Sequence, residues 1–132
     1  LNEAHGFAAA YGYSIINPGG TVRLLHNIVP QSILPHADGK EPAQLLAAFE
    51  TKLRGMAPDP EDAPNIRTEV EITQGRATAQ AICAAAERFD ADIICIGSHT
   101  RPGFTAKVLG SVALAVMQTS RRPVLVVWPP AD

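Results

Sequence analysis

Short apolar runs alternate with longer stretches of helical periodicity along this chain, and this alternation constrains the fold more than any other feature. The strand-like runs cover residues 21–29, 66–73, 93–96 and 123–128. The helical stretches cover residues 1–16, 43–56, 76–90 and 108–120. Such an order predicts an α/β domain in which helices cover both faces of an open parallel sheet.

The strand-like runs differ in the burial that they indicate. IICI (93–96) is continuously apolar, which is typical of a fully buried parallel strand. IRTEVEIT (66–73) alternates apolar and charged residues, so we expect a half-exposed strand near the sheet edge. PVLVVW (123–128) is apolar and bounded by prolines. It is either an inner strand or an edge strand that pairs with another chain.

A chain of this type is expected to begin with a strand, whereas its first element here is a helical stretch. The sequence begins at Leu1 without a methionine. We therefore expect residues 1–132 to form a single domain that lacks its N-terminal strand, with that strand upstream of Leu1. The length is sufficient for one hydrophobic core.

Charge and composition argue against several classes of partner. The net charge of −2 gives no reason to expect nucleic acid or a membrane surface as a partner. No apolar run approaches the length of a membrane span. Cys83 and Cys95 lie in apolar patterns without metal-ligand spacing. They are predicted to be buried free thiols, which suits a cytoplasmic protein.

The loop GSHTRPGFTAKVLGS (97–111) is the best candidate for a ligand site. It follows the strand at 93–96 directly, and ligands of open parallel sheets bind at the carboxyl ends of strands. The amides that begin the next helix can bind an anion, and Arg101 and Lys107 supply positive charge. No Asp or Glu occurs between residues 93 and 131. These features predict an anion site.

An ordinary connecting loop is the alternative interpretation of the same residues. Gly97 and Gly103 would then only shape the turn, and Gly110 would let the following helix approach the sheet closely. Neither a P-loop pattern nor a dinucleotide glycine fingerprint is present.

No combination of residues indicates catalysis. His26 lies inside an apolar strand and is predicted to be a core or strand-end residue and not a ligand, while His5 and His36 are predicted to lie on the surface. His99 has no carboxylate partner nearby in the sequence. The serines lack a nucleophile-elbow context. We expect no enzyme, no catalytic residue and no metal ligand.

Residues 91–127, ADIICIGSHTRPGFTAKVLGSVALAVMQTSRRPVLVV, resemble the signature half of universal stress protein domains. A weaker likeness extends upstream through GGTVRLLHNIV and the first helical stretch. The resemblance implies a five-stranded parallel sheet of the adenine-nucleotide alpha-hydrolase-like type, with the first strand missing from this chain. It also implies a homodimer through the last strand, Pro123 to Trp128, with pairing of tandem domains as the alternative.

Some members of that family bind ATP through a glycine, two residues, a second glycine, nine residues, and Gly-Ser or Gly-Thr. In this chain Gly97 and Gly110-Ser111 match, but Thr100 occupies the second position. A β-branched residue resists both a positive φ and a close approach of phosphate to the backbone. The ligand implied is ATP, with AMP or ADP as alternatives and Mg²⁺ as an accompanying ion. The implied nucleotide-binding residues are Asn27, beside the adenine, Ile96, Gly97, Ser98, His99, Thr100, Arg101, Gly103, Gly110, Ser111 and Val112.

Two functions follow from this resemblance. One is a universal stress protein that binds an adenine nucleotide as a regulatory module in the stress response, with at most slow ATP hydrolysis. The other is a domain of the same type that has lost nucleotide binding through Thr100 and acts through protein–protein contacts. A nucleotide-consuming enzyme of related fold is a third reading, which requires catalytic residues outside this sequence.

Overall fold

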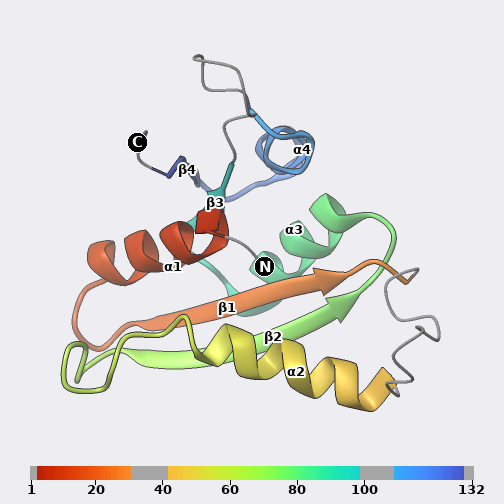
Figure 1. Ribbon diagram of the computed structural model, residues 1–132. Helices are drawn as coiled ribbons and strands as arrows, with labels where there is room; N and C mark the ends of the chain where they lie inside the picture. The colour runs from red at the N-terminus through yellow and green to blue at the C-terminus, as the bar shows by residue number, and fades with distance from the viewer. Residues whose placement is uncertain (1–2, 31–41, 99–108, 130–132) are drawn as a thin grey trace.

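The computed structural model describes residues 3–30, 42–98 and 109–129 (Figure 1). Helices and strands alternate throughout these residues, and each predicted element is present with its ends shifted by a few residues. The elements are α1 (Glu3–Ile15), β1 (Thr21–Ile28), α2 (Pro42–Arg54), β2 (Arg67–Gln74), α3 (Thr78–Phe89), β3 (Ile94–Gly97), α4 (Ser111–Thr119) and β4 (Val124–Val127). The predicted α/β class is confirmed.

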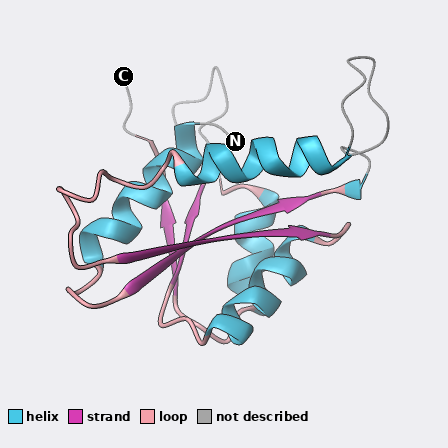
Figure 2. Cartoon of the chain, turned by 90° about the horizontal axis from the view of Figure 1, so that it is seen from below, coloured by secondary structure: helices cyan, strands magenta, loops and turns pink. Residues whose placement is uncertain are grey.

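The strands form two parallel pairs. β1 pairs with β2, with Thr21 opposite Arg67, and β3 pairs with β4, with Ile94 opposite Val124. Within the described residues no strand joins the two pairs. The expectation of one continuous five-stranded sheet therefore differs from the structure, in which the pairs cross one another (Figure 2). A further strand upstream of Leu1 remains a prediction.

Two helices, α1 and α3, connect the two pairs of strands. α1 packs against β1 and also against β3 and β4. α3 packs on β1 and on α4, whereas α2 packs on β1 and β2. Among the described residues the two halves of the molecule thus meet through helices and not through a hydrogen-bonded strand.

The apolar core is divided in the same way. Leu24 and Leu53 belong to a cluster built from α1, α2, β1 and β2, which we call the α2-side core. Ile94 and Val116 belong to a second cluster built from α3, α4, β3 and β4, the α3-side core. Leu53 is 2% exposed and Val116 is 0% exposed, so each cluster has a fully enclosed centre.

The alternation of side chains along β2 confirms the prediction of a half-exposed strand. Val70 and Ile72 pack against the α2-side core. Glu69 and Glu71, which alternate with them along the strand, each accept a hydrogen bond from the Arg23 guanidinium on β1, both at 3.0 Å. One face of this pair of strands is therefore apolar and the other carries ion pairs.

β3 is less buried than its continuous apolar sequence predicts. Ile94 is buried, but Cys95 and Ile96 are half-buried. The reason is that β3 has a strand neighbour on one side only among the described residues. Cys83 is also half-buried, so the two free thiols are less enclosed than expected. Burial still raises the pKa of both.

Arg122 ties the end of α3 to the start of β4. Its guanidinium donates to the carboxylates of Glu87 and Asp90, both at 2.8 Å, and to the carbonyl of Ala91 at 3.0 Å. Asp90 caps α3 with a left-handed φ of 56°. The hydrogen bond from Arg122 lowers the pKa of Glu87 below its ordinary value of 4.5.

A stability profile against pH tests this contact. Because the pKa of Glu87 is lower in the folded than in the unfolded chain, its ionised form stabilises the fold above pH 4.5. That contribution is lost as the pH falls through the folded-state pKa. We expect Glu87→Gln to flatten the loss of unfolding free energy between about pH 5 and pH 3, measured by urea denaturation. Glu61→Gln, at an exposed position without an ion pair among the described residues, is the control, and equal slopes for the two variants would contradict the prediction.

Candidate functional site

The predicted ligand residues fall into two groups in the structure. Asn27 lies at the carboxyl end of β1. Ile96, Gly97, Ser98, Gly110, Ser111 and Val112 lie at the carboxyl end of β3 and the start of α4. Because the two pairs of strands cross, these ends do not form one straight edge (Figure 2). His99, Thr100, Arg101 and Gly103 lie outside the described residues.

Ser98 connects the end of β3 with the start of α4. Its backbone N–H donates to the carbonyl of Val127 at 2.8 Å, which continues the pairing of β3 with β4. Its Oγ accepts the N–H of Gly110 at 2.9 Å. The residue is 2% exposed. The two ends of the glycine loop are thus brought together by a buried hydrogen bond.

The N-terminus of α4 has the features of an anion-binding end. No side chain caps it, and the first bond within the helix runs from the N–H of Leu114 to the carbonyl of Gly110 at 2.9 Å. The amides before Leu114 therefore have no partner within the helix. Ser111 and Val112 are exposed beside them. The helix dipole and these amides together favour a negatively charged ligand.

Gly110 is suited to this position by its size. Its φ of −67° is one that any residue adopts, so backbone conformation does not require a glycine. A Cβ at this position would lie 3.4 Å from the Oγ of Ser98. The close approach of helix and sheet, which the sequence offered as the structural interpretation of Gly110, is therefore what the structure shows.

Asn27 holds together the carboxyl ends of β1 and β2. Its Nδ2 donates to the carbonyl of Gly75 and to the hydroxyl of Thr78, both at 3.0 Å. Its Oδ1 accepts the hydroxyl of Thr73 at 2.9 Å. The side chain is 8% exposed and fully engaged. Sequence reasoning missed its partners, although a polar residue inside an apolar strand was a signal that some partner had to exist. Its predicted contact with adenine remains a prediction.

His26 is the one histidine whose side chain lies within the described residues. It is half-buried near the end of β1 and stacks on Phe49, with the ring centroids 4.7 Å apart. The side chain of His5 and the whole of His36 lie outside what the structure describes. Among the described residues no cluster of His, Cys, Asp or Glu has the arrangement of a metal site. In the same part of the chain, no helix has the length and apolar character needed to cross a bilayer.

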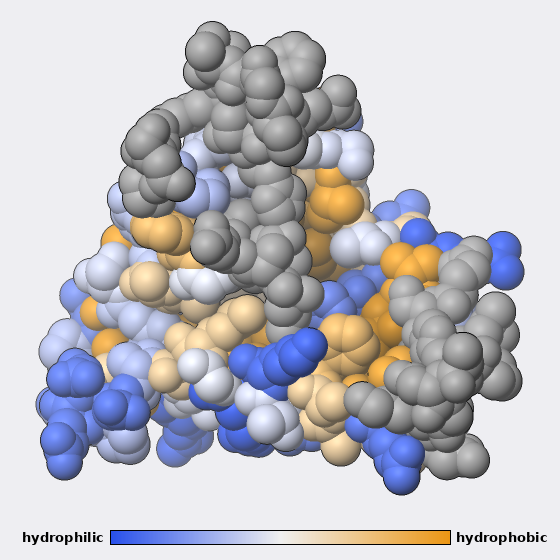
Figure 3. Space-filling view, viewed as in Figure 1, coloured by the Kyte–Doolittle hydropathy of each residue, from blue (hydrophilic) through white to orange (hydrophobic). Residues whose placement is uncertain are grey.

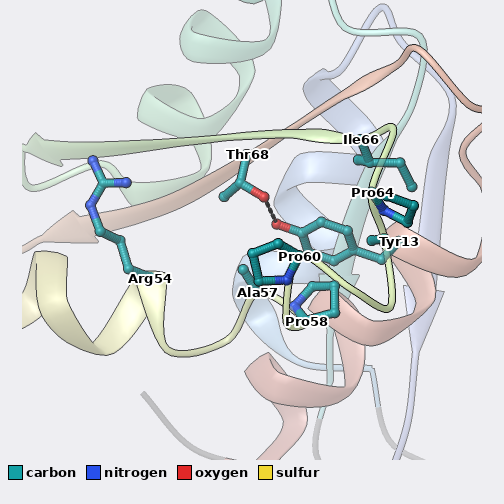
Figure 4. A pocket seen from close by; sticks show the side chains of 9 residues that line it. Tyr13, Arg54, Ala57, Pro58, Pro60, Pro64, Ile66 and Thr68 are labelled. Carbon is teal, nitrogen blue, oxygen red and sulfur yellow. Dashed lines mark hydrogen bonds between the residues drawn. The ribbon is translucent and has the colours of Figure 1, made fainter.

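A cavity lies at the opposite end of β2 from the predicted site. It measures about 320 Å³ and is lined by Tyr13, Arg54, Ala57, Pro58, Pro60, Ala63, Pro64, Ile66 and Thr68. Figure 4 shows the prolines around the tyrosine ring and the hydrogen bond between the hydroxyls of Tyr13 and Thr68. Arg54 is paired with Glu50 at 3.2 Å.

The surroundings of this cavity do not favour an anion. The loop between α2 and β2 carries exposed Asp59, Glu61 and Asp62. In the space-filling view, hydrophilic residues gather where this loop lies, at the lower left (Figure 3). These acids would repel the phosphates of a nucleotide, so we do not place the nucleotide site here.

Comparison with known proteins decides the family. The profile of the universal stress protein family matches residues 2–127. This chain belongs to the universal stress protein family. The match covers nearly the whole sequence, including the glycine loop and the strands on either side of it. A search of curated proteins found no significant match.

Solved structures share the fold of this universal stress protein domain. The hypothetical protein MJ0577 is similar with a TM-score of 0.74 at 25% identity, over 100% of this chain and 92% of that one. The hypothetical protein PH0823 is similar with a TM-score of 0.66 at 20% identity, over 100% of this chain and 94% of that one. A universal stress protein from Archaeoglobus fulgidus is similar with a TM-score of 0.59 at 17% identity, over 96% of this chain and 90% of that one.

Proposed function

We propose that this universal stress protein domain binds ATP, or the related AMP or ADP, as a regulatory module in the cytoplasmic stress response. The observation that carries the proposal is the junction of β3 and α4. There the hydrogen bond from Gly110 to Ser98, 2.9 Å long, brings the glycines at the two ends of the loop together beside the uncapped start of α4.

The chemistry of this junction suits a phosphate chain. The free amides of α4 and the exposed Ser111 hydroxyl are hydrogen-bond donors, and no Asp or Glu occurs from residue 93 to residue 131 to repel an anion. A bound nucleotide would bring Mg²⁺ on its phosphates. We assign the protein no catalytic turnover beyond slow hydrolysis.

Calorimetric titration with ATP tests the proposal. We expect the wild type to bind and Thr100→Gly to bind about tenfold more tightly, because glycine removes the side chain that resists phosphate approach. Ser111→Ala should weaken binding by about fivefold through the loss of one hydroxyl donor. Ser14→Ala, at an exposed serine on α1, is the matched control and should bind as the wild type does. Absence of binding to both the wild type and Thr100→Gly at millimolar ATP would overturn the proposal.

A nucleotide-free interaction module is the second candidate, and the presence of Thr100 in the glycine pattern favours it. On this proposal the protein acts through protein contacts, with its own copy paired along Pro123 to Trp128 or with a tandem domain. β4 supports this because it is apolar and, in the described residues, pairs with β3 alone. The expected result is no binding to the wild type together with a dimer in sedimentation velocity. A nucleotide-binding monomer contradicts it.

A further inference from the structure

The structure assigns Ser98 a positioning role: through Gly110, its buried hydroxyl sets the start of α4 relative to β3 and β4 and thereby shapes the phosphate subsite. The sequence suggested Ser98 as a direct ligand contact. This inference rests on the proposed nucleotide binding, and it concerns the regulation of affinity at that same site.

The first step of the argument is that Ser98 is fixed on the sheet side. Its N–H is bound to Val127 of β4 at 2.8 Å, one position beyond the register pair of Gly97 with Val127. At 2% exposure the side chain faces the interior. The hydroxyl is therefore better placed to organise the protein than to meet a ligand from solvent.

The second step is that Gly110 transmits this position to α4. Its N–H is held by the Oγ of Ser98 at 2.9 Å, and its carbonyl accepts the N–H of Leu114 at 2.9 Å. The peptide unit before Gly110 is therefore hydrogen-bonded to Ser98 at the end of β3, and the peptide unit after it is hydrogen-bonded within the first turn of α4. The direction in which the free amides of α4 point depends on both bonds.

The third step is that Ser98 and Gly110 are in direct contact. A Cβ at Gly110 would lie 3.4 Å from the Oγ of Ser98, at the short end of ordinary van der Waals contact. The φ of Gly110, −67°, is one that any residue adopts, so an effect of a side chain there would come from this contact and not from the backbone.

Binding of ATP and adenosine to Ser98→Ala separates positioning from general structural damage. We expect the variant to bind ATP about fivefold more weakly while adenosine affinity stays within about twofold, because only the phosphates depend on α4. Ser120→Ala is the matched control. It removes a hydroxyl that bonds to Arg122 at the other end of α4 and should affect neither ligand. Equal losses for ATP and adenosine, or no loss for ATP, would overturn the inference.

If the wild type binds no nucleotide, the proposed function is wrong, but the role of Ser98 can still be tested by amide exchange. In the folded protein the N–H of Gly110 should exchange at least about tenfold faster in Ser98→Ala than in the wild type or Ser120→Ala, as measured by NMR. Unchanged exchange contradicts the role of Ser98.

A double-mutant cycle examines the contact between Ser98 and Gly110 independently. The loss of ATP affinity, or of stability where no ligand binds, caused by Gly110→Ala should be smaller in the Ser98→Ala background than in the wild type. Additive effects would contradict direct coupling between the two residues.

Discussion

Leu53→Ala is expected to lower the free energy of unfolding by about 2–5 kcal/mol, the largest effect of any substitution considered for this domain. Leu53 is 2% exposed at the centre of the α2-side core. Truncation leaves a cavity that the helix can close only in part, because β1 and β2 hold the opposite wall. Urea denaturation followed by circular dichroism measures the loss. Leu114→Ala, at a leucine that is 43% exposed on α4, should cost under about 1 kcal/mol.

Because the core is divided, we expect Leu53→Ala to destabilise mainly the half of the molecule that contains the α2-side core. Amide exchange should show α1, α2, β1 and β2 losing protection in Leu53→Ala, while α3, α4, β3 and β4 retain most of theirs. The reason is that the described residues contain no strand that hydrogen-bonds one pair to the other. A uniform loss over all eight elements would show that the two clusters unfold as one unit.

Asn27→Ala is expected to cost about 2–4 kcal/mol, close to the effect of Leu53→Ala although Asn27 is polar. The side chain makes three hydrogen bonds at 8% exposure, and its removal leaves the Gly75 carbonyl and two hydroxyls without that partner. The measurement is the same urea titration.

The control for Asn27→Ala is Asn65→Ala, because Asn65 is exposed and its described hydrogen bond uses the backbone carbonyl. It should change the unfolding free energy by less than about 0.5 kcal/mol. A loss below about 1 kcal/mol for Asn27→Ala would mean that water replaces the missing amide and that the network is not a structural requirement.

Local patterns in the sequence predicted the elements because helix and strand periodicity is local. The alternation in IRTEVEIT predicted which side chains of β2 lie on the core, and Val70 and Ile72 do. Pairing between strands is not local. IICI is equally apolar whether β3 has one neighbouring strand or two, so the half-buried Cys95 could not be predicted.

The same distinction applies to the candidate site. The position of the glycine loop after β3 was predictable from the order of the elements. The bond from Gly110 to Ser98 joins residues twelve positions apart, and no periodicity indicates it. Asn27 was chosen for its place at the end of a strand. Its partners Thr73 and Thr78 come from another strand and a helix, which only the folded chain brings together.

The charged face of β2 has a consequence for solubility. Among the described residues β2 has β1 as its one strand neighbour. Glu69 and Glu71 stand on this strand at alternate positions, half-exposed despite their pairing with Arg23. Two copies that met along β2 would bring acids against acids at close spacing. We expect these acidic side chains to disfavour association of two copies through this strand.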